Sequence, residues 1–324
     1  MEYVKLGRAG VRVSRLCLGC INFGGATEEN DSIRMIHRAL DVGINFLDTA
    51  NIYYDGHSEV VVGKALAGGK RESVFLATKV RLPTGSGPND WGNSRLHIIQ
   101  EVEKSLKRLN TDHIDLYQLH RPDPETPIVE TLRALTDLVQ QGKVRYIGSS
   151  TFPAWRICEA LWTSELRNLE YFVSEQPPYN ILWRGIEQEV LPFCQEYGLA
   201  VLPWSPLAMG FLTGKYKRHD PPPEGSRASL GRFNWLKERF RAAPDQAFDI
   251  VEKVQKIADE HGKPITQFAL RWSMTHPVVT SSIIGPRTME QLEDCLSVLD
   301  WDIDPKALEI IDQLVPPGTN VLSW

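Results

Sequence analysis

The run Ile114-Asp115-Leu116-Tyr117-Gln118-Leu119 and the run Val144-Arg145-Tyr146-Ile147-Gly148 enclose a longer segment, residues 127–141, which ends before Gly142. Each short run has the length and apolar content of a buried strand, and the segment between them has the length of a helix. Two strands joined by a helical crossover lie parallel in a sheet. This stretch therefore predicts one strand–helix–strand unit.

The same unit repeats along most of the chain. Strand-like runs occur eight times, at Leu16–Leu18, Asn45–Leu47, Val74–Thr78, Ile114–Leu119, Val144–Gly148, Phe172–Glu175, Ala200–Pro203 and Ser281–Ile284. Helix-like segments follow them near residues 30–42, 57–67, 94–109, 127–141, 153–166, 187–197, 247–261 and 288–298. Eight parallel strands close a barrel, so we predict an α/β fold, a (β/α)₈ barrel of the TIM type, in one catalytic domain of residues 1–324. A doubly wound open sheet is the alternative, disfavoured because the sequence contains no Gly-x-Gly-x-x-Gly fingerprint.

Four segments lie outside this repeat. Tyr3–Ser14 predicts a hairpin that closes the bottom of the barrel, and residues 264–275 and 305–315 predict two further helices. Residues 206–246 form a long insertion, rich in proline and glycine, after the seventh strand. Insertions of this length are often binding loops, so we expect the part from Leu207 to about Arg232 to act as a lid that is mobile without its ligand.

Composition excludes several classes of partner. The formal net charge is −5 and the basic residues are mixed with acidic ones, which argues against a nucleic-acid partner. The first fifteen residues contain no apolar run, and no stretch reaches the length that spans a bilayer. We therefore expect a cytoplasmic protein without a membrane partner, whose five cysteines are reduced. A homo-oligomer is compatible with the sequence.

The pair Cys17-x-x-Cys20 is the best candidate for a metal site in the sequence, but its spacing is only weak evidence for one. A zinc site needs a second pair of ligands, and the eight histidines show no ligand spacing. On a strand the two side chains would point to opposite faces. We therefore interpret both cysteines as barrel packing and predict no metal.

Four polar residues follow three neighbouring strands. Asp48 and Tyr53 follow the second strand, Lys79 ends the third, and His120 ends the fourth. Each has an ordinary structural explanation: a turn cap, a pocket wall, a solvated strand end and a hydrogen-bonded core histidine. In a barrel, however, the carboxyl ends of the strands meet at one end, where active sites lie.

Together these groups could transfer a proton. A free phenol has a pKa of about 10, and a nearby ammonium lowers it. Asp48 would hold Lys79 charged, and His120 would orient a substrate carbonyl. Tyr53 would then protonate the alkoxide that hydride addition leaves. An aldolase-like barrel with Lys79 as a Schiff base is disfavoured, because that role needs a desolvated neutral amine.

The sequence resembles the aldo-keto reductase superfamily nearly from end to end. The resemblance rests on Gly43-Ile44-Asn45-Phe46-Leu47-Asp48-Thr49-Ala50, Gly56-x-Ser58-Glu59, Leu119-His120-Arg121-Pro122-Asp123, Gly142-Lys143-Val144-Arg145-Tyr146-Ile147-Gly148 and Trp204-Ser205-Pro206-Leu207. The tract Ser226–Leu230 is similar to the branch that contains the β subunits of potassium channels and their bacterial relatives. The resemblance implies a (β/α)₈ barrel that reduces an aldehyde or ketone with NADPH.

The resemblance also implies roles for individual residues. Asp48, Tyr53, Lys79 and His120 match the catalytic positions. The cofactor positions are matched by Ser149, Ser150 and Gln176 for the nicotinamide amide, Trp204 for its ring, Ser205, Leu207, Gly210, Lys215 and Arg227 for the pyrophosphate, and Gly285, Arg287, Gln291 and Asp294 for the adenosine. Arg287 precedes a predicted helix start, where a 2′-phosphate would meet a guanidinium and helix N–H groups, so NADPH is expected over NADH.

The chain departs from the family pattern at two places. Thr151 stands where an asparagine is frequent, and Cys295 replaces an asparagine at the adenine end. Five aromatic residues near strand ends, loops or the tail are candidates for the substrate pocket: Phe23, Tyr54, Trp91, Trp235 and Trp324.

A cofactor-sensing regulatory subunit is the alternative function. The channel subunits in that branch tend to carry asparagine at the position of His120, which favours the enzyme here. The sequence does not indicate which carbonyl compound is the substrate.

Overall fold

The computed structural model describes residues 1–322 and contains eight parallel strands in the order β10-β3-β4-β5-β6-β7-β8-β9. Their bounds are β3 (Leu16–Gly19), β4 (Phe46–Asp48), β5 (Phe75–Val80), β6 (Ile114–Leu119), β7 (Val144–Ser150), β8 (Phe172–Gln176), β9 (Ala200–Val201) and β10 (Ser282–Ile284). The two ends of this sheet meet, because the Thr280 N–H donates to the Val201 carbonyl (2.9 Å) and the Ile283 N–H to the Pro203 carbonyl (2.8 Å). The prediction of a barrel is confirmed, and the open sheet is excluded.

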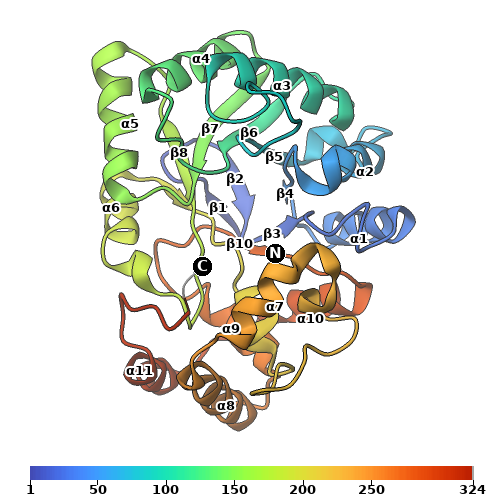
Figure 1. Ribbon diagram of the computed structural model, residues 1–324, viewed down its shortest axis with the longest axis vertical. Helices are drawn as coiled ribbons and strands as arrows, with labels where there is room; N and C mark the ends of the chain where they lie inside the picture. The colour runs from blue at the N-terminus through green and yellow to red at the C-terminus, as the bar shows by residue number, and fades with distance from the viewer. Residues whose placement is uncertain (323–324) are drawn as a thin grey trace.

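The predicted crossover helices are all present, with ends shifted by up to three residues. They are α1 (Glu29–Asp41), α2 (His57–Ala65), α3 (Arg95–Leu109), α4 (Ile128–Gln140), α5 (Ala154–Arg167), α6 (Val190–Tyr197), α8 (Asp245–Glu260) and α10 (Met289–Leu296). The two extra helices are α9 (Ile265–Trp272) and α11 (Pro305–Leu314). Figure 1 shows α1–α5 in an arc around the strands, and α10 packs against α1 on the other side of β3.

The N-terminal hairpin closes the barrel as predicted. Its strands β1 (Tyr3–Lys5) and β2 (Arg12–Ser14) pair antiparallel. Leu6 and Val13 are fully buried and pack in one cluster with Phe46 and Phe75, the first residues of β4 and β5. The hairpin therefore covers the end of the barrel where the strands begin, and leaves the other end for a site.

The alternation of strand side chains determines which residues face that site. Along β5, Phe75 and Ala77 belong to the interior cluster, whereas Leu76 and Val80 belong to the cluster beneath the helices. Because successive side chains point to opposite faces, Lys79 faces the barrel interior near the carboxyl end of β5. The interior is thus apolar where the strands begin and polar where they end.

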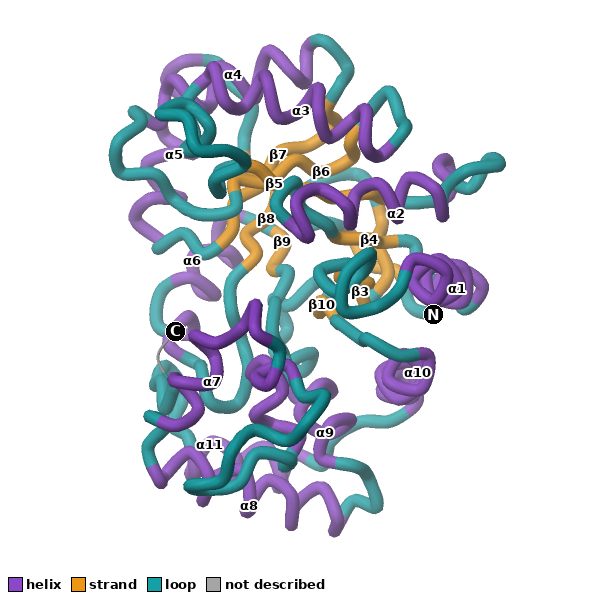
Figure 2. The backbone as a smooth tube through the Cα atoms, turned by 45° about the vertical axis from the view of Figure 1, so that its right-hand side comes forward, coloured by secondary structure: helices purple, strands orange, loops and turns teal. Residues whose placement is uncertain are grey.

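The insertion after β9 contains one helix that the sequence did not predict. Three short 3-10 helices, Ala208–Thr213, Arg227–Ser229 and Gly231–Phe233, lead into α7 (Asn234–Arg241). The helix α7 is held by its buried residues Leu236 and Phe240, and the Phe240 ring packs edge-on against Phe211. Figure 2 shows α7, α8, α9 and α11 as a mostly helical half of the molecule, beside the half with the strands.

The cysteines pack as predicted. All five are free thiols, and Cys17 lies in the interior cluster whereas Cys20 lies beneath the helices. Residues 1–322 contain no group of three histidine, cysteine, aspartate or glutamate side chains that could hold a metal ion. Across the same residues, every helix is too short or too polar to cross a membrane.

Candidate active site

A fully buried ammonium group, that of Lys79, lies at the centre of the polar end of the barrel. Its Nζ atom donates to Asp48 Oδ1, to the carbonyl of Thr49 (2.8 Å) and to the hydroxyl of Tyr53 (3.3 Å). An ammonium has three donors and no acceptor, so these partners use its full capacity. Burial lowers the pKa of Lys79, but the charge of Asp48 and the hydrogen bonds to Asp48 and Tyr53 outweigh burial, and the pKa is raised overall. Lys79 is therefore a fixed cation.

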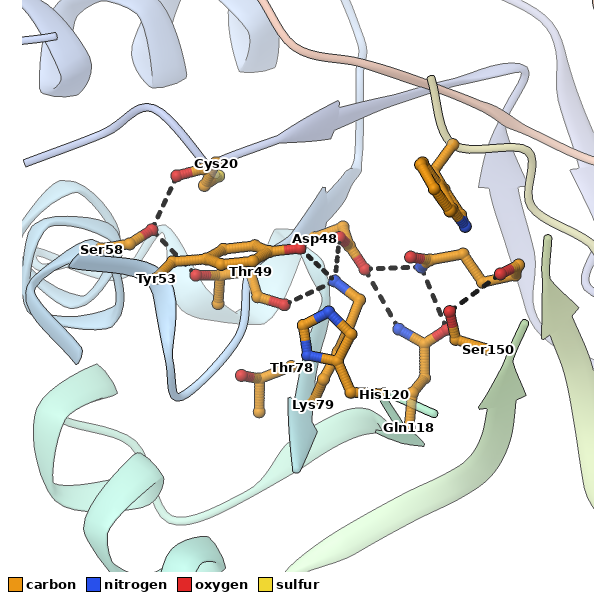
Figure 3. Close-up of polar contacts among 12 residues, drawn as sticks. Cys20, Asp48, Thr49, Tyr53, Ser58, Thr78, Lys79, Gln118, His120 and Ser150 are labelled. Atoms are coloured by element: carbon orange, nitrogen blue, oxygen red, sulfur yellow. Dashed lines mark hydrogen bonds and ion pairs between the residues drawn. The ribbon is translucent and has the colours of Figure 1, made fainter. Parts of the chain in front are cut away.

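Asp48 is held from two sides. One carboxylate oxygen accepts from Lys79, and the other accepts from the side-chain amides of Gln118 (3.1 Å) and Gln176 (2.9 Å). The two amides also contact each other, at 3.1 Å. Figure 3 shows Asp48, Lys79 and Gln118 from the neighbouring strands β4, β5 and β6 joined in this network. The buried ion pair is thus fully hydrogen-bonded, as such pairs must be to persist in a dry interior.

Tyr53 lies over this ion pair, and its ring centroid is 5.0 Å from the Lys79 ammonium. Its hydroxyl oxygen accepts from Lys79, which leaves its own proton free to point into the adjoining cavity. Burial raises the pKa of Tyr53, and although Lys79 lowers it, the pKa is raised overall. The sequence led us to expect the ammonium to decide the direction of this shift. Loss of solvent around the phenol is the larger effect.

His120 completes the group predicted at the strand ends. Its ring meets Tyr53 edge-on, with centroids 5.8 Å apart. Burial, with the charges of Lys79, Arg121 and Arg81, keeps the pKa of His120 well below its ordinary value, so the imidazole is neutral. Its Nδ1 atom is buried, and no described residue is its hydrogen-bond partner. A neutral imidazole with unused capacity is suited to binding a ligand atom.

These groups open into a cavity of about 640 Å³ that runs from Asp48, Tyr53 and His120 to the start of α10. It is lined by most of the predicted cofactor residues: Ser150, Gln176, Trp204, Ser205, Leu207, Gly210, Lys215, Arg227, Gly285, Arg287, Gln291 and Asp294. The indole of Trp204 adds an apolar surface to the same lining. Residues from most of the chain length therefore converge on one elongated cavity.

Ser149 is the predicted cofactor residue that does not line this cavity. Ser149 pairs in register with Glu175, and Ser150 with Gln176. Because alternate residues face opposite sides of a sheet, Ser150 and Gln176 face the cavity while Ser149 and Glu175 face away from it. The Ser149 hydroxyl instead donates to the Glu175 carboxylate (2.5 Å). The alternation of side chains along the strand is the sequence signal that could have shown that only one of the two neighbouring serines faces the cavity.

Three basic side chains gather at the far end of the cavity. Burial and the neighbouring charges of Arg287 and Arg227 lower the pKa of Lys215. Arg227 donates to the Asn22 side chain (3.3 Å) and Arg287 to the Gly225 carbonyl (2.9 Å), so the insertion is tied across the cavity to its opposite wall. No carboxylate of residues 1–322 forms an ion pair with any of the three. Such a cluster suits phosphate groups.

The loop between β9 and this cluster has an unusual backbone. Ser205, Ala208 and Met209 all have positive φ angles, 60°, 48° and 55°, followed by Gly210 at 101°. The Ser205 hydroxyl accepts from the Met209 N–H (2.7 Å) and holds the turn. Residues other than glycine in this conformation cost about 1–3 kcal/mol each, and such strain concentrates at ligand-binding loops. The mobility expected for the lid stays a prediction.

The end of the cavity near α10 contains Asp294 and Cys295, the second of which departs from the family pattern. The Asp294 carboxylate accepts from Thr266 (2.8 Å) and Gln267 (2.7 Å), so both of its oxygens are engaged within the protein. Cys295 lines the cavity, and burial with the Asp294 charge raises the pKa of its thiol to about 12. Gln291 accepts from the Arg287 N–H (2.9 Å) and thereby positions that residue.

The aromatic candidates for the substrate pocket are divided. Trp235 lines the cavity and is 45% exposed. Phe23 is packed beneath the helices, the Tyr54 hydroxyl accepts from the Ala26 N–H (2.9 Å), and neither Tyr54 nor Trp91 reaches the cavity. Trp324 lies outside the described residues. Apolar side chains that the sequence did not indicate, Ile52, Leu82, Met209 and Phe233, line the cavity as well.

Comparison with known proteins agrees with this geometry. The sequence model of the Aldo/keto reductase family matches residues 15–316. The uncharacterized oxidoreductase YrpG of Bacillus subtilis is 43% identical, over 98% of this chain and 97% of its own length. A probable voltage-gated potassium channel subunit beta of rice is 37% identical (97% and 95%), and the versiconal hemiacetal acetate reductase of Aspergillus parasiticus is 33% identical (98% of each).

The chain belongs to the aldo/keto reductase family. It is an oxidoreductase of that family with the barrel that the sequence predicts. The resemblance identified from separate motifs is thereby confirmed.

Two residues of this aldo/keto reductase were missed by the sequence reasoning. Arg121 lines the cavity beside His120. Glu175 is fully buried behind it, and accepts from the Phe152 N–H (3.0 Å) as well as from Ser149. These bonds hold the turn at Thr151, whose φ is +60° and whose hydroxyl accepts from Arg121 (3.0 Å) and from the Trp204 indole (3.4 Å). The threonine thus anchors two cavity walls.

The burial of Glu175 makes stability depend on pH. Burial raises its pKa to about 7 despite the bonds from Ser149 and Phe152. A raised pKa in the folded state means that the contribution is full below the unfolded value of about 4.3 and is lost as the pH rises to about 7. Relative to Glu175→Gln, the parent should lose about 3 kcal/mol of unfolding free energy across that interval and then level off. Urea denaturation at several pH values measures this, and parallel curves for the two proteins would contradict it.

Proposed function

We propose that this aldo/keto reductase reduces an aldehyde or ketone to an alcohol with NADPH, as one barrel-shaped catalytic unit. The observation that carries the proposal is the Tyr53 hydroxyl, which accepts from a fixed ammonium and presents its proton to the cavity. A general acid must hold its proton at the working pH, and the raised pKa of Tyr53 ensures that it does.

The residues of the cavity fit a dinucleotide. Trp204 offers a flat apolar face next to Ser150 and Gln176, which would hold the nicotinamide, and Ser205, Leu207 and Gly210 would line its path. The unneutralised cluster of Lys215, Arg227 and Arg287 would hold the phosphate groups, and Gly285, Gln291 and Asp294 the adenosine end. When bound, the cofactor supplies hydride to the carbonyl carbon.

Side chains of the protein would carry out the proton transfer. Neutral His120 would donate to the carbonyl oxygen and orient it, because its pKa is lowered and its ring lies beside Tyr53. Tyr53 would deliver its proton to the same oxygen as negative charge develops there. Lys79 would stabilise the phenolate that remains, and Asp48 would keep Lys79 in place. The closed barrel wall behind these residues excludes water.

Removal of the phenolic hydroxyl tests the assignment. Tyr53→Phe keeps the ring over Lys79 and should fold and bind NADPH as the parent does. Turnover of carbonyl compounds should fall by about 10²–10⁴-fold, the usual contribution of a general acid. NADPH oxidation measures turnover, and quenching of tryptophan fluorescence measures binding. A variant within a few-fold of the parent would remove Tyr53 from this role.

The choice of cofactor tests the basic cluster. Arg287→Ala should weaken NADPH binding by about 10–100-fold, since a hydrogen bond to a charged group is worth about 1.5–3 kcal/mol. NADH lacks the 2′-phosphate, so its affinity should change little, and the preference for NADPH should shrink. Fluorescence titration with both cofactors distinguishes a contact with the 2′-phosphate from a role in supporting the binding site as a whole. Equal weakening of both would show that Arg287 only supports the loop at Gly225.

A cofactor-sensing subunit is the second candidate, favoured by the 37% identity with the channel subunit beta. Both functions require NADPH binding, and they differ in turnover. Tight binding without oxidation by any aldehyde, ketone or sugar in a broad panel would favour the second function.

A further inference from the structure

Arg121 holds a fixed position at the substrate end of the cavity. Its Nη1 atom donates to the His120 carbonyl (2.7 Å) and to the Thr151 hydroxyl (3.0 Å), and the guanidinium lies 5.5 Å from the centre of the Trp204 ring. The other N–H groups of this guanidinium have no hydrogen-bond partner within residues 1–322. Arg121 is therefore oriented by the protein while part of its donor capacity stays unused.

The charge of Arg121 is not neutralised by the protein. No carboxylate in the described part of the chain lies within ion-pair distance of it. The carboxylate whose charge acts on it is Glu175, which already accepts from Ser149 and Phe152 and whose pKa is raised to about 7 by burial. The other charges nearby, Lys79 and Asp48, cancel each other. Arg121 is therefore a cation beside His120 that forms no ion pair with a described carboxylate.

Arg81 adds a second cation to the same region. It directly follows β5, and its charge contributes to the lowered pKa values of both His120 and Arg121. Its guanidinium lies 5.4 Å from the centre of the Trp91 ring, and its Nε atom is buried with no hydrogen-bond partner among residues 1–322. Its φ angle of +132° is one that residues other than glycine rarely adopt. Arg81 does not line the cavity, and its charge also acts on Asp123, so it adds a positive charge near Arg121 without contacting the ligand space itself.

We propose that Arg121, with Arg81 behind it, binds an anionic group on the substrate, so that the preferred substrates are aldehydes or ketones carrying a carboxylate or a phosphate. The inference rests on the proposed reductase function and names its substrate class. A planar guanidinium with free N–H groups matches either oxyanion, and the partly dry cavity strengthens the attraction. Arg121 would hold the anion while His120 and Tyr53 meet the carbonyl.

Two pairs of substrates test the inference, each differing in one charged group. The first pair is 4-carboxybenzaldehyde and its methyl ester, and the second is glyceraldehyde 3-phosphate and glyceraldehyde. The charged member of at least one pair should have a kcat/KM higher by about tenfold or more, the scale of one charge-assisted bond. A preference in the first pair assigns carboxylate, and one in the second assigns phosphate.

The variant Arg121→Gln should remove that preference, mainly by raising KM for the charged member. Added salt should raise the same KM in the parent, since screening weakens the attraction, and should leave the neutral member unchanged. Arg34→Gln is the matched control, because it removes one positive charge from an exposed position on α1.

The outcomes separate the two proposals. NADPH oxidation with both members of each pair and no preference for charge overturns the inference and leaves the reductase function intact. Equal losses for charged and neutral substrates in Arg121→Gln also overturn it, because they assign Arg121 to the support of Thr151 and Trp204. No oxidation with any of the four compounds overturns the inference, and the broad panel of carbonyl compounds then decides the reductase function.

Discussion

A charged amine without water is the constraint on which the rest of the site depends. Lys79 is fully buried, and an isolated ammonium in such surroundings would lose several kcal/mol of solvation. The barrel provides three acceptors for it: the Asp48 carboxylate at the end of β4, the carbonyl of the next residue, and the hydroxyl of Tyr53. The strands β4 and β5 must therefore end in register, and the loop with Tyr53 must fold back over them. The position of the phenol is a consequence of satisfying the ammonium.

The charges around the cavity form a second pattern. Lys79 and Asp48 cancel in the centre, while cations that form no ion pair with a described carboxylate line both ends: Lys215, Arg227 and Arg287 toward α10, and Arg121 beside His120. Trp204 lines the same cavity, with its ring against Arg121. This distribution suits a long ligand with phosphates at one end and, at the other, a small molecule that carries its own negative charge. The charges thus give the pocket a preference for anionic ligands that its shape alone would not reveal.

Much of the architecture followed from sequence, because alternation and spacing are local. All eight strands and their crossovers were predicted, and Asp48, Tyr53, Lys79 and His120 converge because the carboxyl ends of parallel strands share one end of the barrel. The predictions that failed depended on which face of a strand a residue occupies, on tertiary contacts or on solvation. Ser149 faces away because the register of β7 and β8 decides which serine turns inward, and α7 is held by distant aromatic contacts such as Phe211. The direction of the Tyr53 pKa shift depends on how much water the fold removes from around the phenol. The unused N–H groups of Arg121 can be recognised only once the folded structure shows which residues surround them.

The central claim is that the buried ion pair makes Tyr53 a proton donor, and the double variant Asp48→Asn/Lys79→Met tests it most directly. This change removes both charges together, so no unpaired charge stays in the interior and the barrel should fold. The measurement is the single-turnover rate of NADPH oxidation with a carbonyl substrate in excess, beside NADPH affinity from fluorescence. The account predicts affinity within a few-fold of the parent and a rate lower by about 10²–10⁴-fold, the scale of general acid catalysis. A rate close to that of the parent, with cofactor bound normally, would contradict it.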